Sequence, residues 1–235
     1  MEGDQRQPGD PAELLYLDNH LAVWNKPAGE PVVPDDSGDV SSQERIQVFL
    51  KQRFDKPGNV FAGVVHRLDR PVSGAVVFAR TSKAAARLTR QLQSGGFAKR
   101  YWARCCQAPQ SWPVEIEQWL TKDTRHNRVT AFRHEREGSK RALTRCTPFR
   151  SGVPEDCIQL EPVTGRSHQL RVACASLRAP LLGDLKYGAP TPLSDRSVAL
   201  HARSLGFEHP TRKEQLTFLA PLPARRWWSP LAELT

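Results

Sequence analysis

Residues 65–74 read Val65-His66-Arg67-Leu68-Asp69-Arg70-Pro71-Val72-Ser73-Gly74 and place one carboxylate beside basic side chains, between two apolar runs. The runs, residues 60–65 and 74–79, are short, β-branched and bounded by turn residues, which predicts two buried strands. An Asp held between buried strands and flanked by cations stays ionised and keeps a fixed direction. Asp69 is therefore a candidate nucleophile or general base. The alternative is a turn-capping Asp in a surface salt bridge.

A second basic cluster lies at residues 164–171 and reads Thr164-Gly165-Arg166-Ser167-His168-Gln169-Leu170-Arg171. Together, the two clusters resemble motifs of the RluA family of RNA pseudouridine synthases. The resemblance extends to three further segments, Asn25-Lys26-Pro27-Ala28-Gly29, Lys99-Arg100-Tyr101, and Leu182-Gly183-Asp184 with Tyr187-Gly188. The matches run in the family's order from about Leu14 to Leu219, which is nearly the whole chain.

The fold class expected from the sequence is α+β, because helical and strand patterns alternate without a strict βαβ order. The resemblance implies the pseudouridine synthase catalytic fold, with a mixed, largely antiparallel central sheet flanked by helices and loops. It also implies an active cleft across the middle of that sheet. The expected activity is isomerisation of specific uridines in ribosomal and/or transfer RNA to pseudouridine.

Local patterns predict the individual elements. Residues 14–17 and 21–24 predict a hairpin. Ser41 and Glu44 form a capping-box pattern that begins a helix, which Pro57-Gly58 ends. A second helix begins after Thr81 or Ser82 and ends at Gly95-Gly96. A third, capped by Ser167, is expected to bury one face. Strands are further expected at residues 97–104, near 198–207 and at 215–219. The buried face expected for the third helix consists of Leu170, Ala173, Cys174 and Leu177.

The chain of 235 residues suits one large domain or two intimate subdomains. We expect a disordered tail at residues 1–11 and a catalytic domain at 12–235, without a separate N-terminal RNA-binding module. No apolar run approaches the ~20 residues of a membrane span, and the polar start contains no secretory signal. The five cysteines are an odd count without Cys-x-x-Cys spacing, which argues against a disulfide framework or structural zinc and favours the cytoplasm.

The net charge of +9 favours a polyanionic partner. Many of the cations fall in one stretch with few large apolar residues: Lys122, Arg125, Arg128, Arg133, Arg136, Lys140, Arg141 and Arg145. That stretch is either a solvated hairpin or an RNA-contacting arm. The expected partner is an RNA stem-loop, bound by a monomer.

Cofactor signatures are missing from the sequence. It has no Gly-x-Gly-x-x-Gly fingerprint and no Walker loop. The His-x-Glu and Pro-Cys-x-x-Cys motifs of zinc deaminases do not occur either. Because pseudouridine formation needs no redox group, metal or external donor, we expect neither a cofactor nor a metal.

Three residues are expected to be catalytic by the resemblance. Asp69 would attack or deprotonate the sugar as the C1′–N bond breaks, and the sequence leaves these two roles open. Arg171 would pair with Asp69 and lower its pKa. Tyr101 would stack on the uracil ring and could take the C5 proton.

A further set is expected to bind substrate: Arg67, His66, Arg166, His168, Gln169, Leu170 and Lys26. Arg67 would fill the space left by the extruded uridine, or else contact a phosphate. Arg166, His168 and Gln169 would meet a phosphate at the helix start, or instead cap and pack that loop. Lys26 would position a loop or bind a phosphate.

Two departures from the family pattern stand out. Val72 replaces the usual Thr after the catalytic Asp, and Ala173 replaces a frequent His after Arg171. The alternative function is a catalytically silent RNA-binding or RNA-folding protein of the same fold. Intact Asp69, Tyr101 and Arg171 count against it, since a pure binder has no need of that trio.

Overall fold

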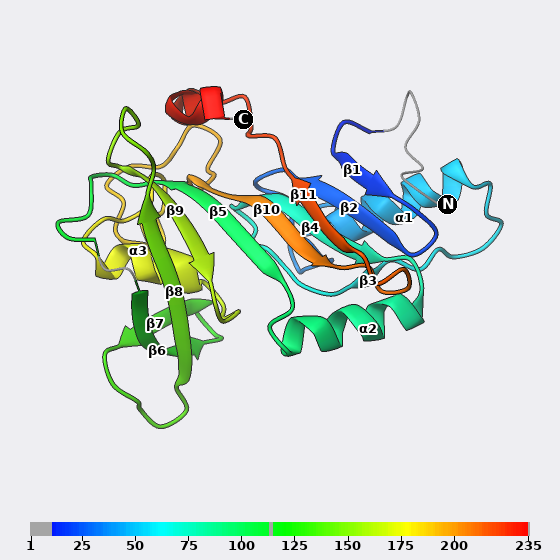
Figure 1. The fold of residues 1–235 in the computed structure, drawn as a ribbon, viewed down its shortest axis with the longest axis horizontal. Helices are drawn as coiled ribbons and strands as arrows, with labels where there is room; N and C mark the ends of the chain where they lie inside the picture. Colours follow the sequence, from blue (N-terminus) through cyan, green and yellow to red (C-terminus); the bar gives the residue numbers. More distant parts are fainter. Residues whose placement is uncertain (1–10, 113–114, 235) are drawn as a thin grey trace. The chain divides into compact units, whose positions relative to one another are not determined.

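The computed structural model describes residues 11–112 and 115–234, which form two compact units. The first unit comprises residues up to Ala98 together with Arg203–Pro221, and the second comprises Lys99–Ala202 and the residues from Leu222 onward. Both contain helices and mostly antiparallel strands, which confirms the α+β class (Figure 1). Except for Pro11, the predicted tail at residues 1–11 lies outside the described residues.

The first unit is built on strands in the order β1-β2-β4-β10, with β3 paired to β4 and β11 paired to β10. Their bounds are Leu14–Leu17 for β1, Leu21–Lys26 for β2, Gly63–Val64 for β3, Ser73–Ala79 for β4, Leu200–Glu208 for β10 and Gln215–Leu219 for β11. The part of β10 from Arg203 onward belongs to this unit. The predicted β1–β2 hairpin is confirmed by antiparallel pairing of Leu17 with Ala22. Every residue of β4 is buried, because apolar side chains meet it on both faces.

Helices α1 (Ser42–Arg53) and α2 (Ser82–Gln93) pack against these strands. The predicted capping box is present in α1, where the Ser41 hydroxyl accepts from the Glu44 N–H and the Glu44 carboxylate accepts from the Ser41 N–H. Thr81 caps α2 with its side chain alone, which accepts the Ala84 N–H. Leu88 of α2 is fully buried and packs with Val77 of β4 in the core of this unit.

The second unit contains strands in the order β5-β9-β8-β6-β7. Their bounds are Ala98–Arg104 for β5, Glu115–Asp123 for β6, Arg128–Phe132 for β7, Lys140–Pro148 for β8 and Cys157–Pro162 for β9. Helix α3 (Gln169–Ser176) packs against β6, β7, β8 and β9. Short 3-10 helices follow, η1 (Leu185–Tyr187) and η2 (Arg226–Leu234), and Trp228 of η2 is buried in a second core.

Two expectations for local structure are wrong. The predicted buried strand at residues 60–65 is reduced to the two half-buried residues of β3, because Gly63 and the exposed Phe61 leave no continuous apolar face. Helix α3 is not capped by Ser167. Its N-cap is His168, which has a left-handed φ of 53° and makes no side-chain capping bond. The Gln169 side chain instead accepts the Arg166 N–H and so holds the preceding loop.

No helix in the described part of the chain is both long and apolar enough to cross a bilayer.

Candidate active site

In the first unit, Asp69 lies half-buried on the loop that leads into β4. The Val72 N–H donates to the Asp69 carbonyl at 3.0 Å and closes a turn there. This turn has an apolar anchor, since Leu68 and Val72 are both buried. The carboxylate is therefore carried by a turn that is fixed at both ends.

The Asp69 turn is joined to a second loop, residues 27–30, by main-chain contacts. The Gly29 N–H donates to the Arg70 carbonyl at 2.8 Å, and Arg70 Nε donates back to the Gly29 carbonyl at 2.9 Å. Gly29 has a φ of 90°, a conformation that residues with a Cβ rarely adopt. The Lys-Pro-Ala-Gly segment thus provides the backbone shape that meets the Asp69 turn.

The Lys26 side chain joins the two loops by hydrogen bonds. It is the last residue of β2 and is fully buried, and its Nζ donates to three carbonyls, those of Pro27 at 2.8 Å, Glu30 at 2.8 Å and Arg70 at 3.2 Å. Burial lowers the pKa of Lys26 to about 7, opposed by the charges of Glu30 and Asp69. A buried amine whose donors all point at the main chain fits the loop-positioning alternative for Lys26.

The two neighbours of Asp69 in the His-Arg-Leu-Asp motif differ in exposure. His66 Nε2 accepts the Val77 N–H at 3.2 Å, and the His66 ring meets the edge of Phe97 at 5.9 Å between centroids. His66 is thus packed against the core of the first unit. Arg67 is exposed and available to a partner in solvent.

In the second unit, Arg171 and Asp184 form a buried bidentate ion pair. Arg171 Nε lies 2.8 Å from Asp184 Oδ2, and Nη2 lies 2.7 Å from Oδ1. The preceding Gly183 has a φ of 81°, and a Cβ there would lie 2.4 Å from the Ser197 carbonyl. Only glycine fits this close approach, so the Gly-Asp order in the sequence places the Asp184 carboxylate under the guanidinium.

Tyr187 connects this ion pair to its surroundings. The Arg171 guanidinium lies 5.1 Å from the centre of the Tyr187 ring, a cation–π distance. The Tyr187 hydroxyl lies 2.6 Å from His168 Nδ1 and accepts the Val129 N–H of β7 at 2.9 Å. His168 and Tyr187 therefore belong to one polar cluster with Arg171 and Asp184.

The other predicted residues of the second basic cluster have distinct environments. Gln169 is buried and donates to the Leu143 carbonyl at 2.9 Å, so its amide packs the loop against β8. Leu170 is buried as well, whereas Arg166 is exposed and donates from Nε to the Arg141 carbonyl at 3.0 Å. Tyr101 is buried in β5, opposite Leu160 of β9.

The candidate residues divide between the two units. Lys26, His66, Arg67 and Asp69 lie in the first, while Tyr101, Arg166, His168, Gln169, Leu170 and Arg171 lie in the second. The pairing of Arg171 with Asp69 stays a prediction. The carboxylate that forms an ion pair with the Arg171 guanidinium, at 2.7 Å, is that of Asp184. Sequence analysis assigned no role to Asp184 or Tyr187. The only indication of their importance in the sequence was that they lie in the Leu-Gly-Asp and Tyr-Gly motifs.

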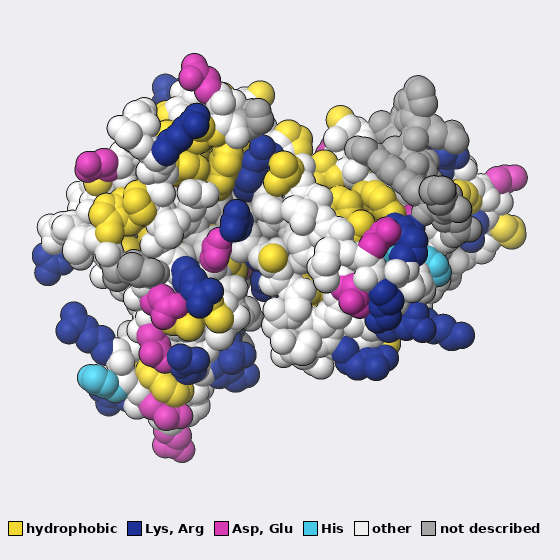
Figure 2. Space-filling model, viewed as in Figure 1, with side chains coloured by type: hydrophobic (Ala, Val, Ile, Leu, Met, Phe, Trp, Pro, Cys, Tyr) yellow, Lys and Arg dark blue, Asp and Glu magenta, His cyan; other side chains and the backbone are white. Residues whose placement is uncertain are grey.

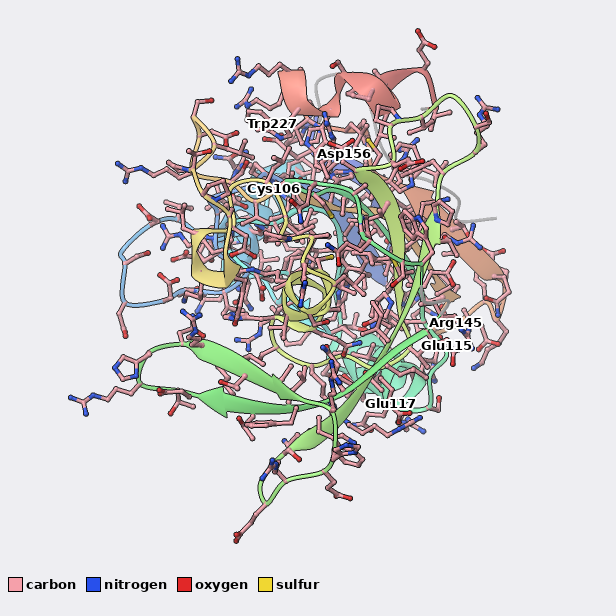
Figure 3. All side chains as sticks on the ribbon, turned by 90° about the vertical axis from the view of Figure 1, so that its left-hand side faces the viewer. Cys106, Glu115, Glu117, Arg145, Asp156 and Trp227 are labelled. Carbon is pink, nitrogen blue, oxygen red and sulfur yellow. The ribbon has the colours of Figure 1, made fainter. Side chains whose placement is uncertain are left out.

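The basic stretch in the second unit forms the β6–β7 hairpin, as the hairpin alternative predicts, and β8 pairs with the other edge of β6. Acidic side chains accompany the cations: Arg145 pairs with Glu115 at 2.9 Å (both labelled in Figure 3), and Arg141 pairs with Glu117. At the lower left of Figure 2, where Figure 1 draws β6, β7 and β8, dark-blue and magenta side chains lie together. These strands are thus partly charge-compensated, and the cations for which no acidic partner is named include Arg125 in the β6–β7 turn and Arg133 beyond β7.

Within residues 11–112 and 115–234, no three His, Cys, Asp or Glu side chains gather in a way that could hold a metal ion.

Comparison with known proteins identifies the family. The model of the RNA pseudouridylate synthase family matches residues 20–176. The chain is 33% identical to an RNA pseudouridine synthase of Bacillus subtilis, YhcT, over 90% of this chain and 69% of that protein. It is also 33% identical to the dual-specificity RNA pseudouridine synthase RluA of Pasteurella multocida, over 91% of this chain and 95% of that protein.

Solved structures agree with the fold. Human RNA pseudouridylate synthase domain containing 1 has a TM-score of 0.71 at 27% identity and covers 93% of this chain and 87% of that one. Human RNA pseudouridylate synthase domain containing 4 has a TM-score of 0.73 at 24% identity, over 92% of this chain and 90% of that one. The chain therefore belongs to the RNA pseudouridylate synthase family, with RluA-type relatives, and is an RNA pseudouridine synthase, an isomerase.

Proposed function

We propose that this enzyme isomerises uridine to pseudouridine in ribosomal and/or transfer RNA, acting on a stem-loop as a monomer. Two relatives support this choice of RNA by their names, the dual-specificity synthase of Pasteurella multocida and ribosomal large subunit pseudouridine synthase D of Zymomonas mobilis, 33% identical to this chain. The net charge of +9 suits a polyanionic substrate of this kind.

Asp69 is the essential carboxylate in this proposal. Isomerisation breaks the bond between C1′ and N1, turns the uracil and joins C5 to C1′. A proton then leaves C5 and a proton is gained at N1, so the RNA gains and loses no atoms overall. An ionised carboxylate serves the first step either by attacking the sugar or by removing a proton from it. Both roles need an oxygen held in one direction.

The observation that carries this assignment is the fastening of the Asp69 turn. Three hydrogen bonds join that turn to residues 26–29: two between Gly29 and Arg70, and one from the buried Lys26 ammonium. Catalytic groups work best when their supporting contacts fix them before substrate arrives. In this role Lys26 positions the loop and does not itself bind RNA.

Arg171 and Tyr101 act on the same nucleotide in the proposal. Arg171 would pair with Asp69 and direct its carboxylate, supported by a guanidinium that is already buried and fixed by Asp184. Tyr101 would stack on the uracil and could take the C5 proton. Arg67, exposed beside Asp69, would brace the space that the extruded uridine leaves, since extrusion costs a few kcal/mol.

Phosphates of the flanking nucleotides would meet His66, Arg166, His168, Gln169 and Leu170 as a group around the loops of both basic motifs. Arg166 is the best placed of these for direct contact, since it is exposed while Gln169 and Leu170 are buried. The buried members would shape the loop from behind.

Mapping of modified sites tests the proposed function. Purified protein is incubated with total RNA from cells that lack its gene, and pseudouridines are mapped before and after. We expect new pseudouridine at one or a few uridines of ribosomal or transfer RNA, matching sites lost in those cells. RNA from cells that contain the gene is the control and should gain nothing. Tight RNA binding without any new pseudouridine would support the silent RNA-binding alternative.

A further inference from the structure

The short segment from Asp184 to Tyr187 contacts both the Arg171 guanidinium and the β6–β7 hairpin. At one end, Asp184 makes the bidentate pair with Arg171. At the other end, Lys186 Nζ donates to the Asn127 carbonyl in the β6–β7 turn at 2.9 Å, and the Tyr187 hydroxyl accepts the Val129 N–H of β7. A segment of four residues thus fixes the guanidinium and a basic hairpin together.

Tyr187 is the centre of this arrangement. Its ring lies 5.1 Å from the Arg171 guanidinium and 5.6 Å from that of Arg128, which comes from β7. The hydroxyl also bonds His168, whose φ of 53° is uncommon for a residue with a side chain. Such a conformation persists only where the surroundings hold it in place. The hydroxyl is one of those surroundings.

Apolar packing joins the same pieces. Val129 of β7 is buried with Leu120 of β6 and Val172 of α3, and Tyr187 packs against that cluster. The hairpin, α3 and the Tyr187 ring therefore share one small core. A shift of β7 would move the Val129 N–H, the Tyr187 hydroxyl and the guanidinium beside the ring.

We propose that Tyr187 is a positioning residue for Arg171, one that couples the guanidinium to the β6–β7 hairpin through its hydroxyl and its ring. The inference rests on the proposed role of Arg171 in catalysis. RNA held by the cations of the hairpin turn would then steady the guanidinium during the reaction. In this proposal Tyr187 acts through Arg171, so its loss lowers turnover and leaves RNA affinity nearly unchanged.

Kinetics of single and double variants test this coupling. Tyr187→Phe keeps the ring and removes the hydroxyl, and we expect kcat to fall roughly ten- to a hundredfold with KM for RNA nearly unchanged. Arg171→Lys keeps the charge and removes the bidentate fork. In the Arg171→Lys background, Tyr187→Phe should cause little further loss, because both changes disturb the same guanidinium.

Tyr16→Phe is the matched control. It removes a buried hydroxyl in the first unit that bonds Asp18 at 2.8 Å and Arg212 at 2.6 Å, so it tests general destabilisation. Its kcat per folded molecule should stay at the wild-type value. If Tyr187→Phe does not fold, His168→Asn replaces it, because Asn tolerates a left-handed φ and lacks the ring nitrogen that Tyr187 bonds.

The outcomes separate the inference from the proposed function. Full kcat in folded Tyr187→Phe, or the same fold loss in both Arg171 backgrounds, would overturn the coupling while leaving Arg171 its role. Full activity of Arg171→Lys and Arg171→Ala would overturn the role of Arg171 and the coupling with it. A kcat loss confined to the wild-type background supports the inference.

Discussion

Lys26 is a fully buried lysine that donates a hydrogen bond to the turn carrying the candidate carboxylate, Asp69. Lys26 gives up solvation and gains three carbonyl partners, and burial still lowers its pKa to about 7. Its charge is therefore conditional near neutral pH, in contrast to an exposed lysine. Lys26 holds the loop beside Asp69 in place, and its attraction for the Asp69 carboxylate is present only when the amine is protonated.

The pH dependence of unfolding should report Lys26. Between about pH 7 and 10.5, the unfolded chain binds a proton at this lysine that the folded chain does not, so the free energy of unfolding rises with pH across that window. Below pH 7 the residue adds no slope. Denaturant titrations of wild type and Lys26→Met at several pH values measure the effect.

The difference between the two proteins is the quantity to compare. Buried thiols act in the opposite direction, as burial raises the pKa of Cys157 to about 11, but they do so equally in both proteins. Lys26→Met should also lower kcat about tenfold by loosening the Asp69 turn. Parallel pH curves for wild type and variant would contradict a lowered pKa at Lys26.

At the scale of elements, the sequence predicted what depends on local chemistry. The capping box of α1 was predictable because a cap needs only residues three apart. For α2 the sequence left Thr81 or Ser82 open as the residue before the helix, and the structure has Thr81 as the N-cap. β11 was predicted with its observed bounds, Gln215–Leu219. The cap of α3 was wrong because a partner distant in sequence intervenes: the Gln169 side chain reaches Leu143 and fixes the loop before the helix can begin at Ser167.

The same reason explains the residues that the sequence missed. Asp184 lies 13 positions beyond Arg171, and no helical or strand period connects them. Their pairing depends on the turn at Gly183, which only the folded chain reveals. The motif marked Asp184 and Tyr187 as notable, but their partners could not be derived from spacing.

The cations at the β6–β7 hairpin allow a prediction about RNA binding. Arg125 in the β6–β7 turn and Arg133 beyond β7 are exposed, so each could meet a phosphate. Replacing both by Gln should weaken RNA binding and lower the slope of log Kd against log salt by about 0.7 to 0.9 for each lost phosphate contact. Filter binding at several salt concentrations measures the slope.

A matched charge change elsewhere gives the control for the hairpins. Lys51 in α1 and Lys56 just beyond it are exposed as well, and their replacement by Gln removes the same charge from the first unit. We expect this pair to leave the slope nearly unchanged. Equal slopes for wild type and the hairpin variant would show that Arg125 and Arg133 are solvated side chains that do not contact RNA phosphates.

At the scale of the whole molecule, the proposed chemistry draws on both units. The first supplies Asp69 and the fastened turn that carries it, and the second supplies Tyr101, Arg171 and the cluster around Tyr187. The sequence predicted the family because short motifs kept their order along the chain, and the roles of Asp69, Tyr101 and Arg171 stay predictions. It left one large domain or two subdomains open, and it gave neither the bounds of the two units nor the buried contacts around each group, since both arise from long-range packing.

The measurement that tests the central claim most directly is single-turnover conversion of a mapped RNA by Asp69→Asn, with affinity measured on the same protein. We predict a rate at least about a thousandfold below wild type, because the amide can neither attack nor accept a proton, and a Kd within a few-fold of wild type. Asp36→Asn, the same change at an exposed loop position of the first unit, should react at the wild-type rate. Conversion by Asp69→Asn at a rate near wild type would contradict the account.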